Sequence, residues 1–467
     1  MDKADNSPVA CTERLRYWLP ALLHFNRTRI FNREFLARVV KQTEQDAARM
    51  RQVLPNLTPE ARLHSATALF EASVIFHNLP ASREWRNAAE KAIRDYLEAY
   101  QKPDGSIDKS LKHSLAVIET IVPSLAMSYR AGLPLSGELA SRTQSLLEVL
   151  MYMLDMNGCL PFAPSEEDQT NKREWLFWGS RIFQRPDFAW VAYGGLDALE
   201  IRPPCETSRA FPDMGLYVMR NNWEIRRFLH RGQAWESDLQ PANMSHTMWI
   251  DAPKGVIELF ACGERQVRLV LPASIQTRDW RVGKQGVVLE GVVGTGKLTV
   301  VHLISADAWI VRLDGLTNSD IKIISLRFPL RETAGGKGMV TCPIRPAVRW
   351  DWGTRLGMRS FGSVCLRTDG QIVRKDEKGF SVRSAGKEGM LTLVIVGAYR
   401  PRSRFVKIDR QDVSKLAEDR RVAITPEGCA LDVCEEPPES RKNWSCPWQP
   451  LQLLFGNSRI MLNDDRL

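Results

Sequence analysis

Residues 285–306 read QGVVLEGVVGTGKLTVVHLISA and come within one residue of the phosphate-binding pattern G-x-x-x-x-G-K-[ST]. Leu298 occupies the last position, where that pattern needs a hydroxyl group to hold magnesium. A phosphate loop must also follow a buried strand and open a helix, so that helical N–H groups point at the anion. Here β-branched residues lie on both sides of Gly294-Thr295-Gly296, which is typical of two strands joined by a glycine turn. The stretch therefore predicts a β-hairpin in which Lys297 begins the return strand and contacts no phosphate.

The alternating pattern of this hairpin extends through the C-terminal half of the chain. From about Phe211 onwards, short segments with a period of two are separated by Gly, Asn and Asp turns, without helical segments between them. The predicted strands lie in residues 215–222, 224–232, 255–263, 266–273, 286–294, 297–306, 308–316, 321–330, 363–370, 380–385 and 390–399. So many consecutive strands indicate antiparallel sheets packed face to face, and not a parallel α/β sheet.

The N-terminal half has the period of a helix. Apolar residues recur at three- and four-residue spacing in residues 34–54, 59–77, 84–100, 111–132 and 136–154. Thr58-Pro59-Glu60 and Ser136-Gly137-Glu138 are typical helix starts. Amphipathic helices with such short links predict antiparallel helical hairpins, stacked or closed into a ring.

The change of period divides the chain. Pro203-Pro204 marks a plausible boundary, so we predict a helical domain in residues 1–205 and an antiparallel β domain in residues 206–467. The charged stretch EEPPESRKN sets off a C-terminal extension of the β domain. A length of 467 residues fits two or three domains.

Composition excludes several classes of protein. No apolar run is long enough to span a bilayer, and the N-terminus lacks the basic start and apolar core of a secretory signal. We expect a cytoplasmic location, or a periplasmic one if a signal peptide has been removed. The nine cysteines are scattered without a C-x-x-C pair. Mostly reduced thiols are therefore expected, and no residue cluster calls for a metal or a cofactor.

The net charge of +9 indicates a polyanionic partner, such as nucleic acid, an acidic glycan or a membrane surface. No basic helix, zinc pattern or aromatic-basic repeat supports nucleic acid, which we do not expect as a partner. The charge alone does not separate a glycan from a membrane surface.

Three stretches resemble, in order along the chain, segments of the heparinase II/III-type polysaccharide lyases. QKPDGSIDKSLKHSLAV (101–117) resembles the segment in which a "pDGs" turn precedes a helix bearing a catalytic Asn or His. MYMLDMNGCLPFAPSEED (151–168) resembles the later "DG-lP" turn. FPDMGLYVMRNNWEIRRFLHRG (211–232) resembles the first β strands, which carry "F-x-x-x-G-x-x-x-x-R". The resemblance implies an α+β multidomain fold: an incomplete (α/α) toroid followed by an antiparallel β-sandwich.

The same resemblance implies cleavage of uronate-containing polysaccharides by β-elimination. The proton next to a uronate carboxylate is too weakly acidic to leave unaided. A site must therefore neutralise the carboxylate, remove the proton with a base and protonate the leaving oxygen. Members of the family use Asn, His or Arg for the first task, and Tyr or His for the others.

The resemblance assigns candidate residues unevenly. His113 follows the first turn at about the family's spacing, with Lys112 in place of a tyrosine. In LQPANMSHTMWIDA (239–252), Asn243 lies where the family has an Asp, and His246 substitutes for a histidine that is missing at Pro241. No tyrosine follows the second turn. Tyr193 is the nearest candidate, and Trp175 or Trp178 occupies the family position.

Each candidate also has a structural alternative. His113 fits a partly buried helix histidine, and His246 fits a strand histidine. The tryptophans fit sugar-stacking faces or core residues equally well. Arginines can pair with uronates or sulfates through bidentate contacts, or serve as surface or structural residues. The arginines concerned are Arg173, Arg181, Arg185 and Arg220.

Two functions stay open. The first is a polysaccharide lyase, a carbon–oxygen lyase, in which His113 and His246 face one groove between the two domains. The second is a non-catalytic protein of the same fold that binds an acidic glycan or a partner in polysaccharide assembly. The sequence does not predict the oligomeric state or the identity of the sugar.

Overall fold

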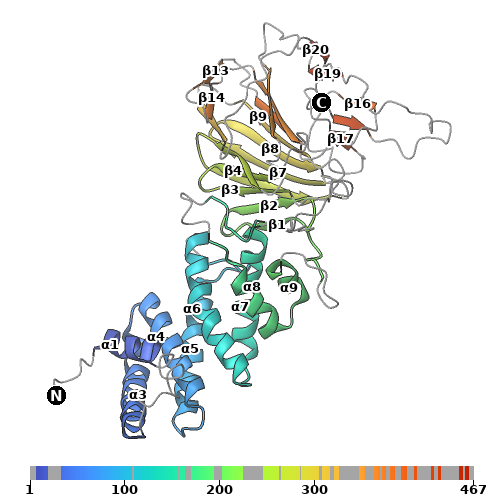
Figure 1. The fold of residues 1–467 in the computed structure, drawn as a ribbon. Coiled ribbons are helices and arrows are strands. Elements are labelled where there is room, and N and C mark those ends of the chain that lie inside the picture. The colour runs from blue at the N-terminus through green and yellow to red at the C-terminus, as the bar shows by residue number, and fades with distance from the viewer. Residues whose placement is uncertain are drawn as a thin grey trace, which may run out of the picture. The chain divides into compact units, whose positions relative to one another are not determined.

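The computed structural model describes most of the N-terminal two-thirds of the chain and separate strands beyond it (Figure 1). The described residues are 7–18, 33–107, 110–155, 157–162, 170–193, 202–223, 246–261, 264–283, 286–303, 308–315 and 320–325, with strands between 347 and 461. Two compact units divide the chain. The helical unit comprises Met1–Met151, Lys172–Tyr193 and Ala198–Arg202, and the β unit comprises Tyr152–Asn171, Gly194–Asp197 and Pro203–Leu467.

The five predicted helices are all present, with two further helices after them. The described helical elements are α1 (Pro8–Glu13), η1 (Arg14–Trp18), α3 (Arg33–Val53), η2 (Leu54–Asn56), α4 (Pro59–Ile75), α5 (Ser82–Tyr100), α6 (Leu111–Arg130), α7 (Gly137–Met153), α8 (Arg173–Phe183) and α9 (Pro186–Ala192). Pro59 opens α4 directly after Thr58, because proline has no N–H to lose in a first helical turn. Helix α4 packs against both α5 and α6. None of the described helices is both long and apolar enough to cross a membrane.

Two large antiparallel sheets form the body of the β unit. The first has the order β1-β2-β3-β4-β5-β10-β14-β13 and the second the order β11-β12-β15-β9-β8-β7-β6. Strands of the first are β1 (Arg209–Phe211), β2 (Leu216–Arg220), β3 (Thr247–Asp251), β4 (Val256–Ala261), β5 (Glu264–Val270), β10 (Asp320–Ser325), β13 (Gln371–Arg374) and β14 (Gly379–Arg383). Strands of the second are β6 (Ile275–Val282), β7 (Gly286–Val293), β8 (Gly296–Leu303), β9 (Ala308–Asp314), β11 (Ala347–Trp352), β12 (Gly362–Thr368) and β15 (Leu391–Val396).

Smaller sheets lie near the C-terminus. They have the orders β16-β18-β17 and β19-β20. Their strands are β16 (Arg404–Val406), β17 (Val422–Ile424), β18 (Ala430–Asp432), β19 (Gln452–Phe455) and β20 (Ser458–Met461).

The two large sheets share one hydrophobic core. Met248 and Ile257 of the first sheet lie in the same buried cluster as Leu289, Val300 and Val311 of the second. Side chains that interdigitate from two antiparallel sheets make a β-sandwich, as the alternating period predicts.

The hairpin predicted from the glycine turn is confirmed. Strands β7 and β8 pair antiparallel from Val293 opposite Gly296. Gly294 has φ +58°, whereas Thr295 is not among the residues with positive φ, which is the pattern of a type II′ turn. Lys297 lies on the return strand, with its Nζ 3.1 Å from Glu290 Oε1 of β7. The turn is one residue shorter than expected, because Gly296 already pairs in the sheet.

Some strands had no clear sequence pattern. All five residues of β3 are buried, so this central strand lacks the alternation that marks a half-exposed one. Strand β6 lies at the edge of its sheet, where polar side chains such as Arg278 and Asp279 break the apolar pattern. The predicted strand in residues 224–232 lies outside the described residues.

Candidate functional site

The first Asp-Gly turn leads into the helix that carries His113. The Gly105 N–H donates to the Lys102 carbonyl at 2.9 Å. Asp104 Oδ1 accepts from both the backbone N–H (2.9 Å) and the hydroxyl (2.5 Å) of Ser106. Gly105 has φ +89°, and a Cβ there would lie 2.8 Å from the Ser145 carbonyl oxygen. Only glycine therefore fits this turn without displacing α7.

His113 sits in the first turn of α6 in a defined position. Its backbone N–H donates to the Oγ of Ser110, the residue that caps the helix, at 3.1 Å. Its imidazole Nε2 lies 3.0 Å from the hydroxyl oxygen of Tyr96, which comes from α5. The His113 side chain is partly buried, whereas Tyr96 is only 3% exposed. The ring is thus held from both its backbone and its far end.

The second turn belongs to the β unit. Asp155 Oδ1 accepts the backbone N–H groups of Asn157 (2.8 Å) and Cys159 (2.9 Å). Gly158 has φ +80°, which allows the chain to reverse. These bonds make a tight loop at the end of α7.

Arg220 connects that loop to strand β2. Its Nη2 donates to the carbonyls of Leu154 (2.8 Å) and Tyr152 (3.3 Å), and Trp249 Nε1 also donates to Tyr152 at 3.3 Å. These bonds tie Tyr152 and Leu154 to the β unit, although the period of the sequence placed both residues in the helical domain. The second and third family-like stretches thus meet at one arginine.

The environment of Arg220 is dry and aromatic. The side chain is 1% exposed, and its guanidinium lies 3.9 Å over the ring of Trp223. Burial lowers the pKa of Arg220 to about 9, although the nearby Asp155 carboxylate opposes that shift. The geometry fits an arginine that organises the loop, and its contact with a uronate stays a prediction.

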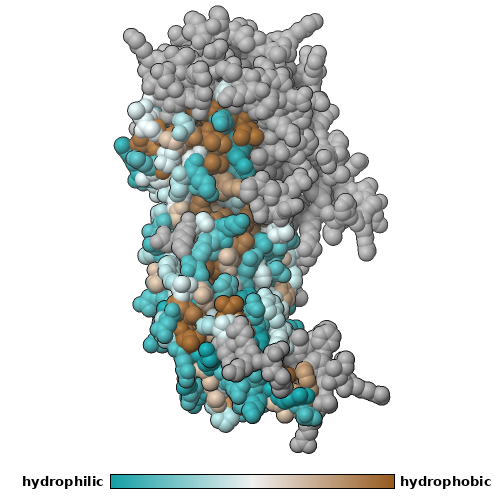
Figure 2. Space-filling view, turned by 90° about the vertical axis from the view of Figure 1, so that its left-hand side faces the viewer, coloured by the Kyte–Doolittle hydropathy of each residue, from teal (hydrophilic) through white to brown (hydrophobic). Residues whose placement is uncertain are grey.

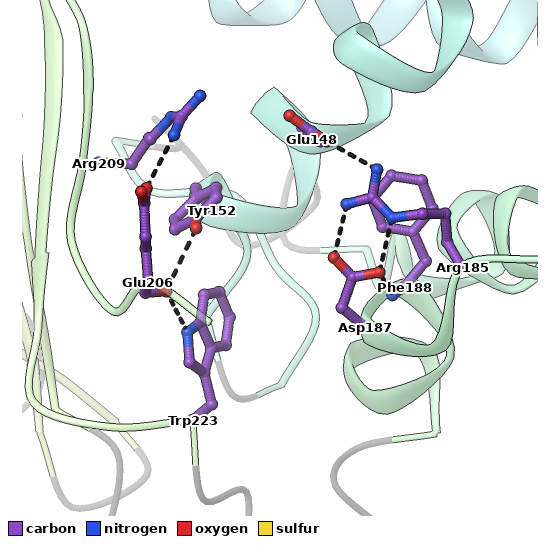
Figure 3. A network of polar contacts seen from close by, with 8 residues as sticks. All are labelled: Glu148, Tyr152, Arg185, Asp187, Phe188, Glu206, Arg209 and Trp223. Atoms are coloured by element: carbon purple, nitrogen blue, oxygen red, sulfur yellow. Dashed lines mark hydrogen bonds and ion pairs between the residues drawn. The ribbon is translucent and has the colours of Figure 1, made fainter. Parts of the chain in front are cut away.

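Figure 3 shows the contacts around the next segment, Glu206–Arg209, within the β unit. The Glu206 carbonyl accepts from Tyr152 Oη (3.2 Å) and Trp223 Nε1 (2.7 Å), and its carboxylate pairs with Arg209 at 2.7 Å. Tyr152 is 5% exposed. Sequence reasoning missed this tyrosine, because an aromatic residue inside a helical period is indistinguishable from core packing.

His246 lies just before β3 and is fully buried. Its backbone N–H donates to Asn221 Oδ1 at 2.7 Å, and the Asn221 N–H returns a bond to its carbonyl at 3.2 Å. The His246 imidazole lies edge-on to the Trp309 ring, with the ring centroids 6.2 Å apart. The Trp309 ring in turn stacks on His302, with the ring centroids 4.7 Å apart. Asn243 lies outside the described residues.

His302 was not among the predicted site residues. Its position in the sequence gave a signal, because it continues the inward-facing series Leu298 and Val300 along β8. A histidine on the core face of a strand is a group that needs an explanation, whether structural or functional.

Tyr193 and the two tryptophans belong to the helical unit. Tyr193 ends α9, and its hydroxyl accepts from Arg181 Nη2 at 3.2 Å. Trp178 lies under the guanidinium of Arg130 at 5.3 Å. Trp175 is partly buried on the same helix, α8. Exposed cations thus contact aromatic rings along α6, α8 and α9, a combination that suits acidic sugars.

Arg185 is fully engaged within the helical unit. It donates to Glu148 (2.7 Å) and Asp187 (2.6 Å) and lies over the ring of Phe188 (Figure 3). The hydrogen bond that Arg185 donates to Asp187 raises the pKa of Arg185 further above its usual range, with Glu148 adding to the effect. Among the arginines considered from sequence, Arg185 is therefore engaged in a local ion-pair network, whereas Arg181 keeps an exposed side chain.

The predicted residues fall into two sets. Tyr193, Trp175, Trp178 and His113 belong to the helical unit, while Arg220 and His246 belong to the β unit. Within the β unit, Asn221 follows Arg220 directly and bonds to His246, so the two candidates are neighbours along one local network. A common groove for His113 and His246 stays a prediction.

The exposed surface differs in polarity from place to place. On the face drawn in Figure 2, hydrophilic residues predominate over the helical unit, and hydrophobic ones form separate small groups. In the part of the chain that the structure describes, no group of three His, Cys, Asp or Glu residues is arranged to hold a metal ion.

Comparison with known proteins supports a relationship at the level of the fold. No family model and no curated protein matches this sequence. Among solved structures, a mutant of the heparan sulfate lyase HepC from Pedobacter heparinus matches with a TM-score of 0.64 and 14% identity, over 88% of this chain and 71% of that one. A heparinase III described as the BT4657 gene product matches with a TM-score of 0.60 and 14% identity, over 87% and 70%.

A third structure, titled heparinase III, has a TM-score of 0.57 and 12% identity, over 87% of this chain and 72% of that one. At such low identity these matches establish the fold alone. They confirm the expected architecture, an (α/α) toroid followed by an antiparallel β-sandwich.

Proposed function

We propose that this chain is a polysaccharide lyase that cleaves an acidic, uronate-containing glycan by β-elimination. The observation that carries the proposal is the first Asp-Gly turn, which delivers a capped helix with His113 in its first turn. The fold likeness to heparan sulfate lyases supports the same chemistry. In this proposal the substrate's carboxylate is held by one set of groups, and protons are moved by another.

The proposed roles follow from side-chain chemistry and from the family resemblance. Tyr193 is a phenol in contact with a guanidinium, so a developing negative charge on its oxygen is stabilised as a proton leaves or arrives. Trp175 and Trp178 offer faces for sugar rings, and Asn243 and Arg220 are kept as candidate substrate contacts. His246 is the proposed partner of His113 from the β unit.

One observation favours a second candidate function. His246 is 0% exposed, and a catalytic group must touch its substrate. A protein with this fold but an incomplete catalytic set would bind an acidic glycan, or a partner in polysaccharide assembly, without cleaving it.

The two functions are separated by one assay. The purified full chain is incubated with heparan sulfate, heparin, chondroitin sulfate, hyaluronate and alginate, and the ultraviolet absorbance of the unsaturated uronate is followed. A lyase produces that absorbance, whereas a binding protein retains the polysaccharide without absorbance change. If the chain neither cleaves nor retains any of these polysaccharides, both functions are contradicted.

If cleavage is found, His113→Ala and His246→Ala are each expected to lower turnover by roughly 10²–10⁴, the usual contribution of a positioned acid or base, or of a donor that stabilises developing charge. Lys297→Ala is the matched control, because the Lys297 side chain is exposed on β8 and its described ion pair is with Glu290. A variant at His246 with full turnover would remove that residue from the catalytic set.

A further inference from the structure

The contact between Tyr96 and His113 joins two helices of the helical unit. Tyr96 lies on α5, and its hydroxyl oxygen is 3.0 Å from Nε2 of His113 on α6. Tyr96 is 3% exposed, and its ring packs against Tyr100 one turn further along α5, with ring centroids 4.8 Å apart. A buried, packed phenol has little freedom to leave this hydrogen bond.

The direction of the bond follows from acid–base chemistry. A phenol O–H, with an ordinary pKa near ~10, is a far stronger acid than the N–H of a neutral imidazole. The unprotonated imidazole nitrogen is in turn a better acceptor than a phenol oxygen. The Tyr96 O–H therefore donates to Nε2, and the neutral His113 ring carries its single proton on Nδ1.

We propose that Tyr96 is the positioning residue of His113 and fixes it in the Nδ1–H tautomer. Tyr96 is too buried to touch a polysaccharide, so it acts through the histidine. The consequence for catalysis rests on the proposed lyase function. A histidine held with its proton on Nδ1 suits donation of a hydrogen bond to the uronate carboxylate, and it gains and loses no proton during the elimination.

The tautomer is measured directly by nitrogen NMR on the full chain labelled with ¹⁵N-histidine. Spectra are recorded at about pH 8, above the ordinary imidazole pKa of ~6.5, and the His113 signals are assigned by their loss in His113→Gln. With seven histidines in the chain, this assignment is practicable. The wild-type spectrum is expected to show protonated Nδ1 and unprotonated Nε2 at His113.

Tyr96→Phe keeps the ring and removes the donor, so the His113 signals are expected to move towards a mixture of the two tautomers. Tyr129→Phe is the control, because Tyr129 is an exposed tyrosine on the same helix as His113. A wild-type His113 protonated on Nε2 would overturn the proposal, and so would a tautomer unchanged by Tyr96→Phe. The wild-type spectrum is decisive even if the variant does not fold.

Activity gives a separate measurement. If the chain cleaves a polysaccharide, Tyr96→Phe is expected to lower kcat/KM by roughly tenfold, the effect of one misdirected hydrogen bond, and Tyr129→Phe to leave it unchanged. If the chain cleaves no polysaccharide but His113 shows the expected tautomer, only the lyase function is contradicted. Cleavage by a chain whose His113 carries its proton on Nε2 contradicts the role of Tyr96 alone.

Discussion

Arg220 provides a test of how the loop at the end of α7 is held to the sheet. The two variants to compare are Arg220→Met and Arg220→Lys. Lysine is the more conservative change in charge, yet we expect Arg220→Lys to destabilise the β unit more than Arg220→Met. The reason is that lysine keeps the buried charge but loses the flat, forked geometry that makes this charge tolerable.

The magnitudes follow from the contacts. A pKa lowered from 12.5 to about 9 corresponds to about 5 kcal/mol of unfavourable charge burial, at about 1.36 kcal/mol per pH unit. The bond to Leu154 contributes about 1.5–3 kcal/mol and the stacking over Trp223 about 2 kcal/mol. Methionine loses both contacts but also removes the burial cost, so its net effect should stay within about 2 kcal/mol of the wild type. Lysine keeps the cost and loses the stacking, for a net loss of about 2 kcal/mol.

The assay is thermal unfolding followed by tryptophan fluorescence, since Trp223 and Trp249 both lie at the site. A loss of about 2 kcal/mol lowers the Tm of a unit of this size by roughly 4–8 °C. Arg281→Lys is the control, because Arg281 makes exposed ion pairs on β6 that contribute little to stability. If Arg220→Lys melts at the same temperature as the wild type, or above Arg220→Met, the reasoning about the buried charge is refuted.

Three further predictions concern other parts of the chain. Burial raises the pKa of Glu71 above its ordinary 4.5, so the ionised carboxylate costs stability, and the helical unit loses stability as the pH rises through the raised pKa. In Glu71→Gln, the melting temperature should therefore depend less on pH. Gly105→Ala should cost roughly 1–3 kcal/mol more than Gly132→Ala, because both have positive φ but only Gly105 faces a close carbonyl; equal melting temperatures would argue against a tight turn. ATP should leave the melting temperature of the wild type unchanged, because Lys297 lies on a hairpin, and a stabilisation that is lost in Lys297→Ala would refute this.

Much of the fold follows from periodicity. The five long helices were predictable from apolar residues at three- and four-residue spacing, and the hairpin from β-branched segments on both sides of the turn at Gly294. Strand β3 was not, since burial on both faces removes alternation. Tyr152 and Leu154 accept long-range bonds from Arg220 and Trp249 of the sheet, which no local pattern encodes.

The candidate site was predictable in its parts, and less so in its contacts. The resemblance pointed to His113, because this histidine follows the Asp-Gly turn at about the family's spacing, and the structure adds the serine cap of its helix. The partner of His113 comes from a different helix, 17 positions earlier in the chain, so the sequence gave no reason to pair it with Tyr96. Arg220 was identified as a candidate, but its engagement with two backbone carbonyls depends on where the second turn lies in space.

The tyrosine that elimination chemistry requires can be sought among the described tyrosines by their contacts. Tyr96 is buried against a histidine, and the Tyr152 hydroxyl donates to a backbone carbonyl from a position that is 5% exposed. Both phenols are therefore occupied in holding structure. Tyr193 differs, because it is partly exposed and its oxygen accepts a hydrogen bond from the exposed guanidinium of Arg181. A cation beside the oxygen stabilises the charge that develops there during proton transfer. The physical argument thus favours Tyr193 over Tyr96 and Tyr152 as the proton-moving group of the proposed lyase.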